Sequence, residues 1–196
     1  MAHADERQLP TLEDEARFWA VLEAAWTPLG PEVGQARRAL TFRALDSRPD
    51  ISVAADGLRP FLDTLADHCS GLPADELISL DRVLERKLYD IDRADIQAVT
   101  DGSDDGFLYA RGFIVAMGRD FYDAVAANPQ MGVPDAECEE MCYFFVHLYR
   151  QRFGDFPDTG SGISRESCSN AVGWVGLTGY RDAGQAHLWC ARPAAD

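Results

Sequence analysis

The sequence has no apolar run near the roughly 18 residues that a membrane-spanning helix needs. Its first ten residues also lack the apolar stretch of a secretory signal peptide. Basic residues are scarce: 18 Lys and Arg stand against 33 Asp and Glu, so the formal net charge is −15. Because phosphate backbones and anionic lipids attract clustered cations, this balance argues against binding to nucleic acid or to a membrane surface. We therefore expect a cytoplasmic protein.

Motifs of familiar enzymes are missing as well. The chain has no Gly-x-Ser-x-Gly nucleophile elbow, no phosphate-binding loop with its Lys, and no EF-hand spacing of acidic residues. Its five cysteines are odd in number and irregularly spaced, which is typical of reduced thiols. These residues predict no cofactor, apart from a divalent metal considered below.

What the sequence does contain is helical periodicity. Apolar residues recur at spacings of three and four along most of the chain. This pattern predicts a mostly α protein with one compact domain of about six to seven helices over residues 11–157, after a flexible N-terminus at 1–10. Thr11 and Asp14 are expected to cap the first helix, and Pro31, Pro73 and Pro134 to open later ones.

Three further expectations concern irregular or polar parts of the chain. Residues 47–57 are predicted to form a loop. The helix after Pro73 is predicted to keep one charged face in solvent, with Asp75, Glu76, Asp81, Arg82, Glu85, Arg86 and Lys87. The tail at 158–196 is rich in Gly and Ser, and its short runs at 174–180 and 185–192 are compatible with a β-hairpin.

The stretch 103–122 contains a motif that is similar to one in a known protein family. It contains Ser103-Asp104-Asp105-Gly106-Phe107, then Tyr109, Arg111-Gly112, Ile114, Gly118-Arg119 and Tyr122. This string resembles the bacterial family of domain of unknown function 4240, which is common in actinobacteria. Weaker similarity at Phe18-Trp19, at residues 77–90 and at residues 139–157 extends the resemblance over about 12–157. The resemblance implies a mostly helical fold and assigns no activity.

The acidic loop around Asp101, Asp104 and Asp105 has two interpretations. Closely spaced oxygen ligands suit a divalent metal such as Mg²⁺ or Ca²⁺. The same residues are also typical of a helix start, where Ser103 or Asp104 caps free N–H groups and carboxylates face the positive end of the helix. Capping alone explains these residue types, so we do not expect a metal site here.

Arg111 and Arg119 are the second set of candidates, with Tyr109 beside them in sequence. Arg111 falls on the apolar stripe of its helix, where a guanidinium needs a partner. One hypothesis is a structural ion pair with Asp90 or Asp105. The other is a clamp for an anionic ligand, with Asp90, Arg111 and Arg119 as candidate ligand-binding residues.

These candidates lead to two hypotheses for function. The first is a non-catalytic, immunity-like or regulatory module whose acidic surface binds a basic protein partner. The second is an enzyme or small-molecule binder with a cleft at the acidic loop, in which Asp104 and Asp105 act as acid and base or bind metal. In that case Arg111 holds an anionic substrate and Tyr109 orients it. His147, within an aromatic run, is a further candidate base, although a packed histidine is the commoner outcome there.

Overall fold

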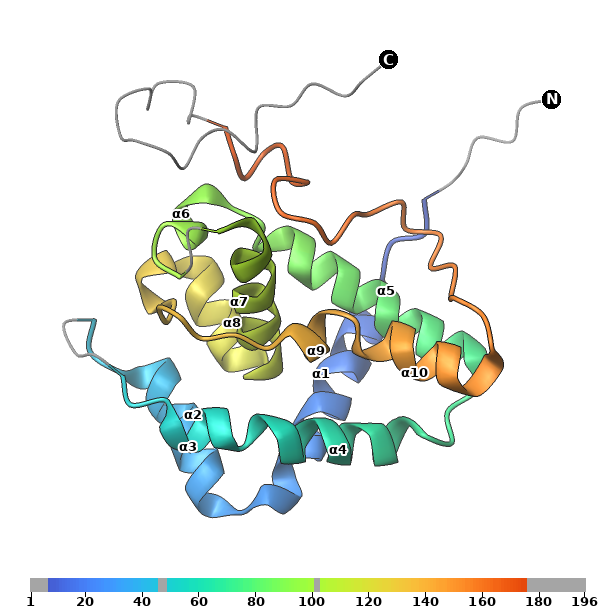
Figure 1. Cartoon of the computed structure of the whole chain (residues 1–196), viewed down its shortest axis with the longest axis horizontal. Helices are drawn as coiled ribbons and strands as arrows, with labels where there is room; N and C mark the ends of the chain where they lie inside the picture. Colours follow the sequence, from blue (N-terminus) through green and yellow to red (C-terminus); the bar gives the residue numbers. More distant parts are fainter. Residues whose placement is uncertain (1–6, 46–48, 101–102, 176–196) are drawn as a thin grey trace.

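The protein is described by a computed structural model covering residues 7–45, 49–100 and 103–175, and it is mostly helical, as predicted (Figure 1). The helices in chain order are α1 (Leu12–Trp26), η1 (Thr27–Leu29), α2 (Pro31–Phe42), α3 (Ser52–Asp56), α4 (Leu58–Cys69), α5 (Ala74–Asp90), α6 (Ala94–Gln97), α7 (Asp104–Ala116), α8 (Arg119–Ala127), η2 (Pro129–Met131), α9 (Glu139–Cys142) and α10 (Phe144–Phe153). Among these described helices, α1, α2, α4, α5, α7, α8 and α10 are long, and they agree with the six to seven expected.

Local signals set most of the helix boundaries. The Thr11 hydroxyl accepts from Asp14 N at 3.1 Å, and the Asp14 carboxylate accepts from Thr11 N at 2.8 Å, so the predicted capping box is confirmed. Pro31 opens α2 at its first position. Gly154 ends α10 with a φ of 80°, a left-handed conformation that glycine adopts without steric cost.

The core forms around α1. This helix packs against α4 and α5, while α10 covers α5 and α7 packs with α5, α8 and α9. Trp26 of α1 stacks on Phe61 of α4 with ring centroids 4.3 Å apart. The Trp26 indole also donates to the Ala116 carbonyl of α7 at 2.7 Å, so one side chain ties α1 to two neighbouring helices.

The structure corrects two of the expected boundaries. The segment at 47–57 is not entirely a loop, because α3 occupies Ser52–Asp56 after an Asp50 carboxylate that accepts from Ser52 N. Pro134 does not open a continuous last helix. A backbone bond from Cys138 N to the Tyr109 carbonyl holds this segment against α7 instead, and a bond from Asp135 N to the Thr100 carbonyl holds it to the chain ahead of α7. Tyr143, with a φ of −124°, then separates α9 from α10.

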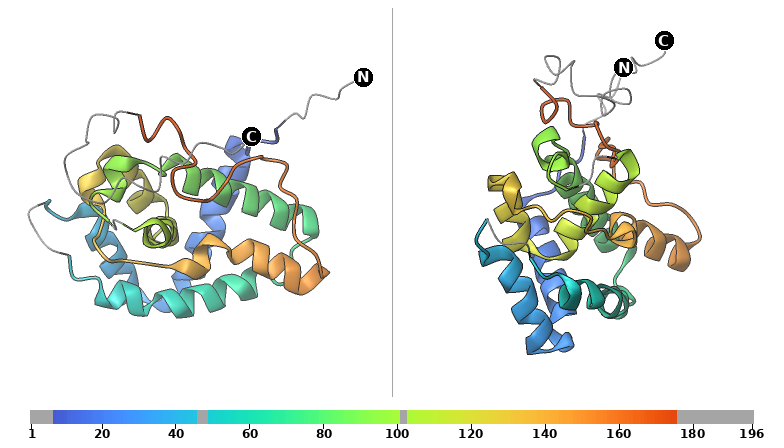
Figure 2. Two further views of the ribbon diagram at one scale, coloured as in Figure 1. Left: turned by 45° about the horizontal axis from the view of Figure 1, so that its top comes forward. Right: turned by 60° about the vertical axis from the view of Figure 1, so that its left-hand side comes forward.

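After α10, the chain turns back across the domain. We call residues 158–175 the strap. It passes over α5 and ends beside α6, as two of the views show (Figures 1 and 2). The strap contains no strand, and most of the predicted hairpin (176–196) lies outside the described residues.

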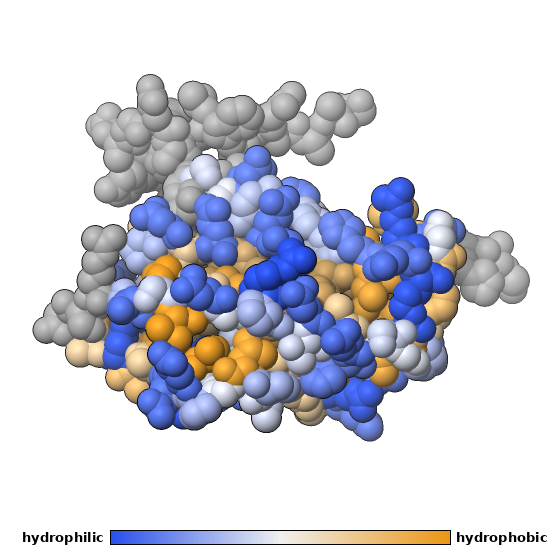
Figure 3. All heavy atoms as spheres, turned by 60° about the horizontal axis from the view of Figure 1, so that its bottom comes forward, coloured by the Kyte–Doolittle hydropathy of each residue, from blue (hydrophilic) through white to orange (hydrophobic). Residues whose placement is uncertain are grey.

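The remaining surface is mixed in character. Figure 3 shows apolar residues in small groups among hydrophilic ones on the face that comes forward from the bottom of Figure 1. Phe42 and Leu45 are among the exposed apolar side chains of the described chain. Within the described residues, no helix combines the length and the apolar character needed to cross a membrane.

Candidate functional site

The acidic loop leads into the start of α7. Ser103 is the N-cap, and its hydroxyl accepts from Gly106 N at 3.0 Å. Asp105 is exposed in the first turn, where a carboxylate interacts favourably with the helix dipole. Asp101 and the side chain of Asp104 lie outside the described residues. Among the residues that are described, no group of three or more His, Cys, Asp or Glu side chains is arranged to hold a metal ion.

Tyr109 lies one turn after Asp105 and faces the segment before α9. Partial burial, together with the nearby Glu139 and Asp105 carboxylates, raises the pKa of the Tyr109 phenol. Tyr143 follows in the same neighbourhood, where burial and the Glu166 carboxylate raise its pKa as well. We call this surface the acidic edge; its members are Asp105, Tyr109, Glu137, Glu139, Glu140 and Tyr143.

Glu137 of the acidic edge is exposed because burial alternates along the segment before α9. Residues 134–138 run as an irregular segment in which buried Ala136 and Cys138 alternate with exposed Asp135 and Glu137. His147, one turn beyond Tyr143, lies beside it with ring centroids 6.0 Å apart. The structure therefore brings the candidates Asp105 and Tyr109 together and places His147 at the margin of the same surface.

Arg111 lies elsewhere, in the interior. Its side chain is fully buried on α7, over the Phe107 ring at 4.8 Å. One guanidinium nitrogen donates to the Leu88 carbonyl at 3.0 Å. The other donates to the Arg165 carbonyl at 3.0 Å and to the Ser167 hydroxyl at 3.2 Å. These bonds join α7 to the end of α5 and to the strap, so the guanidinium does not face solvent.

Arg165 of the strap makes a second buried cluster, which the sequence did not predict. Its guanidinium donates to Asp81 at 2.6 Å, to Glu85 at 3.2 Å and to the Cys142 carbonyl at 2.6 Å. Glu85 also accepts from the Thr159 hydroxyl at 2.6 Å and the Ser161 hydroxyl at 2.7 Å. The charged face of α5 was expected in solvent. That expectation is wrong for Asp81 and Glu85, because the strap covers them, and also for Lys87, which is buried and pairs with Glu15 of α1 at 2.7 Å.

Asp92, just after α5, anchors the far end of the strap. Its buried carboxylate accepts from Cys168 N at 3.0 Å, Asn170 N at 2.8 Å and the Trp174 indole at 3.1 Å. We call six of the residues that bind the strap the strap site, namely Asp81, Glu85, Leu88, Asp92, Arg111 and Cys142. Asp81, Glu85 and Arg165 could not be singled out in advance, because charged residues in an amphipathic helix or a Gly-rich tail usually face water.

Asp90, a predicted partner of Arg111, pairs with Arg86 at 2.8 Å instead. Burial raises the pKa of the Asp90 carboxyl, and the Arg86 cation opposes this shift. Asp90 also borders an open cavity of about 700 Å³ between the end of α5 and the strap, with Arg93 and Asn170 on its rim.

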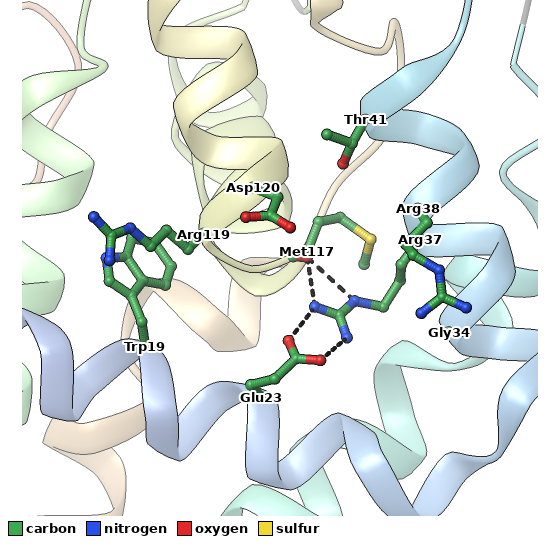
Figure 4. Close-up of a pocket in the computed structure, with 9 residues that line it drawn as sticks. All are labelled: Trp19, Glu23, Gly34, Arg37, Arg38, Thr41, Met117, Arg119 and Asp120. Atoms are coloured by element: carbon green, nitrogen blue, oxygen red, sulfur yellow. Dashed lines mark hydrogen bonds and ion pairs between the residues drawn. The ribbon is translucent and has the colours of Figure 1, made fainter.

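Arg119 lies in a different place, at the start of α8. It pairs loosely with Asp123 at 3.4 Å and lines a cavity of about 290 Å³ between α1, α2 and α8. Figure 4 shows Arg119 beside Trp19, while Arg37 occupies the middle of the cavity. Arg37 is paired with Glu23 at 2.9 Å and donates to the Met117 carbonyl at 2.8 Å. The structure thus places Arg111 and Arg119 in separate surroundings.

The cysteines differ in state. Cys69, Cys138 and Cys142 are buried free thiols. Burial raises the pKa of each to about 12, so none is a reactive thiolate at neutral pH. Cys168 is disulfide-bonded, which corrects the expectation that all five thiols are reduced.

The fold and these surfaces define an all-α domain with an appended strap. A family model described as "protein of unknown function (DUF4240)" matches residues 14–151. The chain belongs to this family, as the resemblance at 103–122 indicated. No curated protein and no solved structure matches the chain.

Proposed function

We propose that the protein is a non-catalytic, cytoplasmic binding module whose acidic edge binds a basic protein partner. The observation that carries this proposal is the composition of the edge, where Glu139 lies close to Tyr109 and the exposed Glu137 and Glu140 flank Glu139 in the chain. Between Arg119 and Arg150 the sequence has no Lys or Arg, so the chain segment that carries these three glutamates supplies no cation of its own. Tyrosine is enriched in protein interfaces, whose rims are polar.

The charge of the acidic edge affects the rate of encounter with a partner as well as the affinity. A surface of one sign raises the local concentration of an oppositely charged partner and speeds association at low salt. The net charge of −15 adds a long-range field of the same sign. The alternative, an enzyme centred on Asp104, Asp105 and Arg111, has less support because the Arg111 guanidinium is buried and bonded to carbonyl groups.

The test compares two variants with the same change in net charge. Glu137→Lys/Glu140→Lys reverses the acidic edge, whereas Asp67→Lys/Asp75→Lys reverses exposed carboxylates on α4 and α5. Full-length chains are purified from their own host at low salt, and bound polypeptides are measured by quantitative mass spectrometry. We expect a Lys- and Arg-rich partner that the control variant retains and the edge variant loses. At about 1 M salt, where the Debye length is about 3 Å, the partner should also dissociate.

A position-specific measurement completes this test. A photocrosslinking residue in place of Tyr109 should form a covalent adduct with the partner, whereas the same residue in place of Asp67 should not. Equal recovery of the partner by both charge variants, or crosslinking at both positions alike, would contradict the proposal.

A further inference from the structure

The strap is held to the domain mainly by polar groups. Arg165 reaches two carboxylates, the Thr159 and Ser161 hydroxyls reach Glu85, and backbone N–H groups reach Asp92. Among the described strap residues, Trp174 alone packs against the hydrophobic core. Hydrogen bonds of this kind can be replaced, one for one, by those of another extended chain.

The strap leaves one buried hydrogen-bond acceptor of its site without a donor among the described residues. Asp81 is about 1% exposed, yet among the described residues its Oδ1 has no hydrogen-bond partner. Two carboxylates, Asp81 and Glu85, face the single guanidinium of Arg165. Buried polar atoms are nearly always paired in folded proteins. The strap site therefore retains a buried acceptor that a different occupant, with one more donor, would fill.

The strap and its site also belong to different parts of the chain. The family match ends at residue 151, whereas the strap begins at 158. All six residues of the strap site fall between Asp81 and Cys142, inside the matched region. These six residues thus lie within the matched region, whereas the segment that fills the site lies beyond its end.

We propose that the strap site is a peptide-binding site for an extended, arginine-bearing segment of a partner protein, which the strap occupies until it is displaced. The planar guanidinium explains the preference for arginine, because Arg165 contacts Asp81, Glu85 and the Cys142 carbonyl at once. The Arg111 guanidinium adds a second requirement: it binds the backbone carbonyl of that arginine and a hydroxyl two residues further on. This site is separate from the acidic edge, and its test does not depend on that surface.

The experiment converts the strap into an exchangeable ligand after the chain has folded. A protease recognition sequence is inserted between Gly154 and Asp155, which are exposed, and the folded full chain is cut there in reducing buffer. A fluorescent synthetic peptide of residues 157–175 is then added, and its binding is followed by anisotropy while native mass spectrometry follows release of the cut segment. We expect the peptide to replace the segment.

Substitutions in the peptide leave the folding of the domain untouched. Arg165→Ala in the peptide should weaken binding at least tenfold, whereas Val172→Ala, at an exposed position, should leave it unchanged. On the domain side, Glu85→Gln should weaken binding, and the exposed Glu140→Gln should not.

Three results would overturn the proposal. A cut segment that stays bound in the presence of a hundredfold excess of peptide, or a chain that unfolds when cut, would show that the strap is an integral part of the fold. An Arg165→Ala peptide that binds as well as the unaltered one would show that the arginine is not recognised.

Discussion

Replacing Gly112 with alanine tests the close contact between α7 and α9. Gly112 lies in α7 where α9 crosses it. A Cβ atom at this position would overlap the Cys138 carbonyl oxygen and stand 2.6 Å from Cys142 Sγ. The first of these neighbours is backbone, which cannot rotate away, so α7 and α9 have to separate. The position therefore requires glycine because of space and not because of backbone conformation.

The expected magnitude follows from two opposing effects. Alanine in a helix interior is favoured over glycine by about 1 kcal/mol. Overpacking a rigid contact costs about 1–3 kcal/mol and occasionally more. Because the overlap here is with a main-chain carbonyl, we expect the upper end of that range and a net loss of about 2 kcal/mol. Gly34→Ala in α2 is the matched control, since its Cβ would meet only the Arg38 guanidinium at 3.7 Å. It should stabilise the protein by about 0.5–1 kcal/mol.

Urea denaturation followed by tryptophan fluorescence measures both free energies of unfolding. The changes in the free energy of unfolding should have opposite signs in the two variants, although both variants replace a helical glycine with alanine. Adding Cys142→Ala to Gly112→Ala should recover part of the loss, because it removes the movable neighbour and leaves the carbonyl. If Gly112→Ala were as stable as Gly34→Ala, the close approach of α7 and α9 would be refuted.

Three further outcomes are expected. Thr11→Ala removes the capping box and should cost about 1 kcal/mol in thermal or urea unfolding, whereas Thr64→Ala, at a half-buried position inside α4 that caps no helix end, should cost less. Burial raises the pKa of Asp81, so the folded chain binds this proton more readily than the unfolded chain. The stability of the wild type relative to Asp81→Asn should therefore increase as pH falls from 7 toward 4.5, and a decrease in urea titrations would contradict this. Glu139→Gln should lower the pKa of Tyr109, as a tyrosinate absorbance titration against Tyr109→Phe would show, because a carboxylate beside the phenol is removed.

Much of the helical architecture was predictable because it depends on local interactions. The stripe of Phe18, Leu22 and Trp26 follows the 3.6-residue period, and all three side chains are buried in α1. Thr11, Pro31 and Gly154 mark boundaries through hydrogen bonds or backbone angles within a few residues of themselves. The family motif at 103–122 likewise indicated a helical domain from sequence alone.

The contacts that define both candidate surfaces were decided by tertiary structure. Arg165 meets Asp81 across 84 positions of the chain, and Tyr109 meets Glu139 because residues 134–138 bond to α7 instead of forming a helix. The recurrence of apolar residues at spacings of three and four shows which face of α5 turns toward the core. It cannot show that a Gly-rich segment crosses the other face, because solvent and a polar strap satisfy the same carboxylates. The sequence by itself therefore determined most of the long helices, and only the packing of distant segments determined which charged residues are buried together.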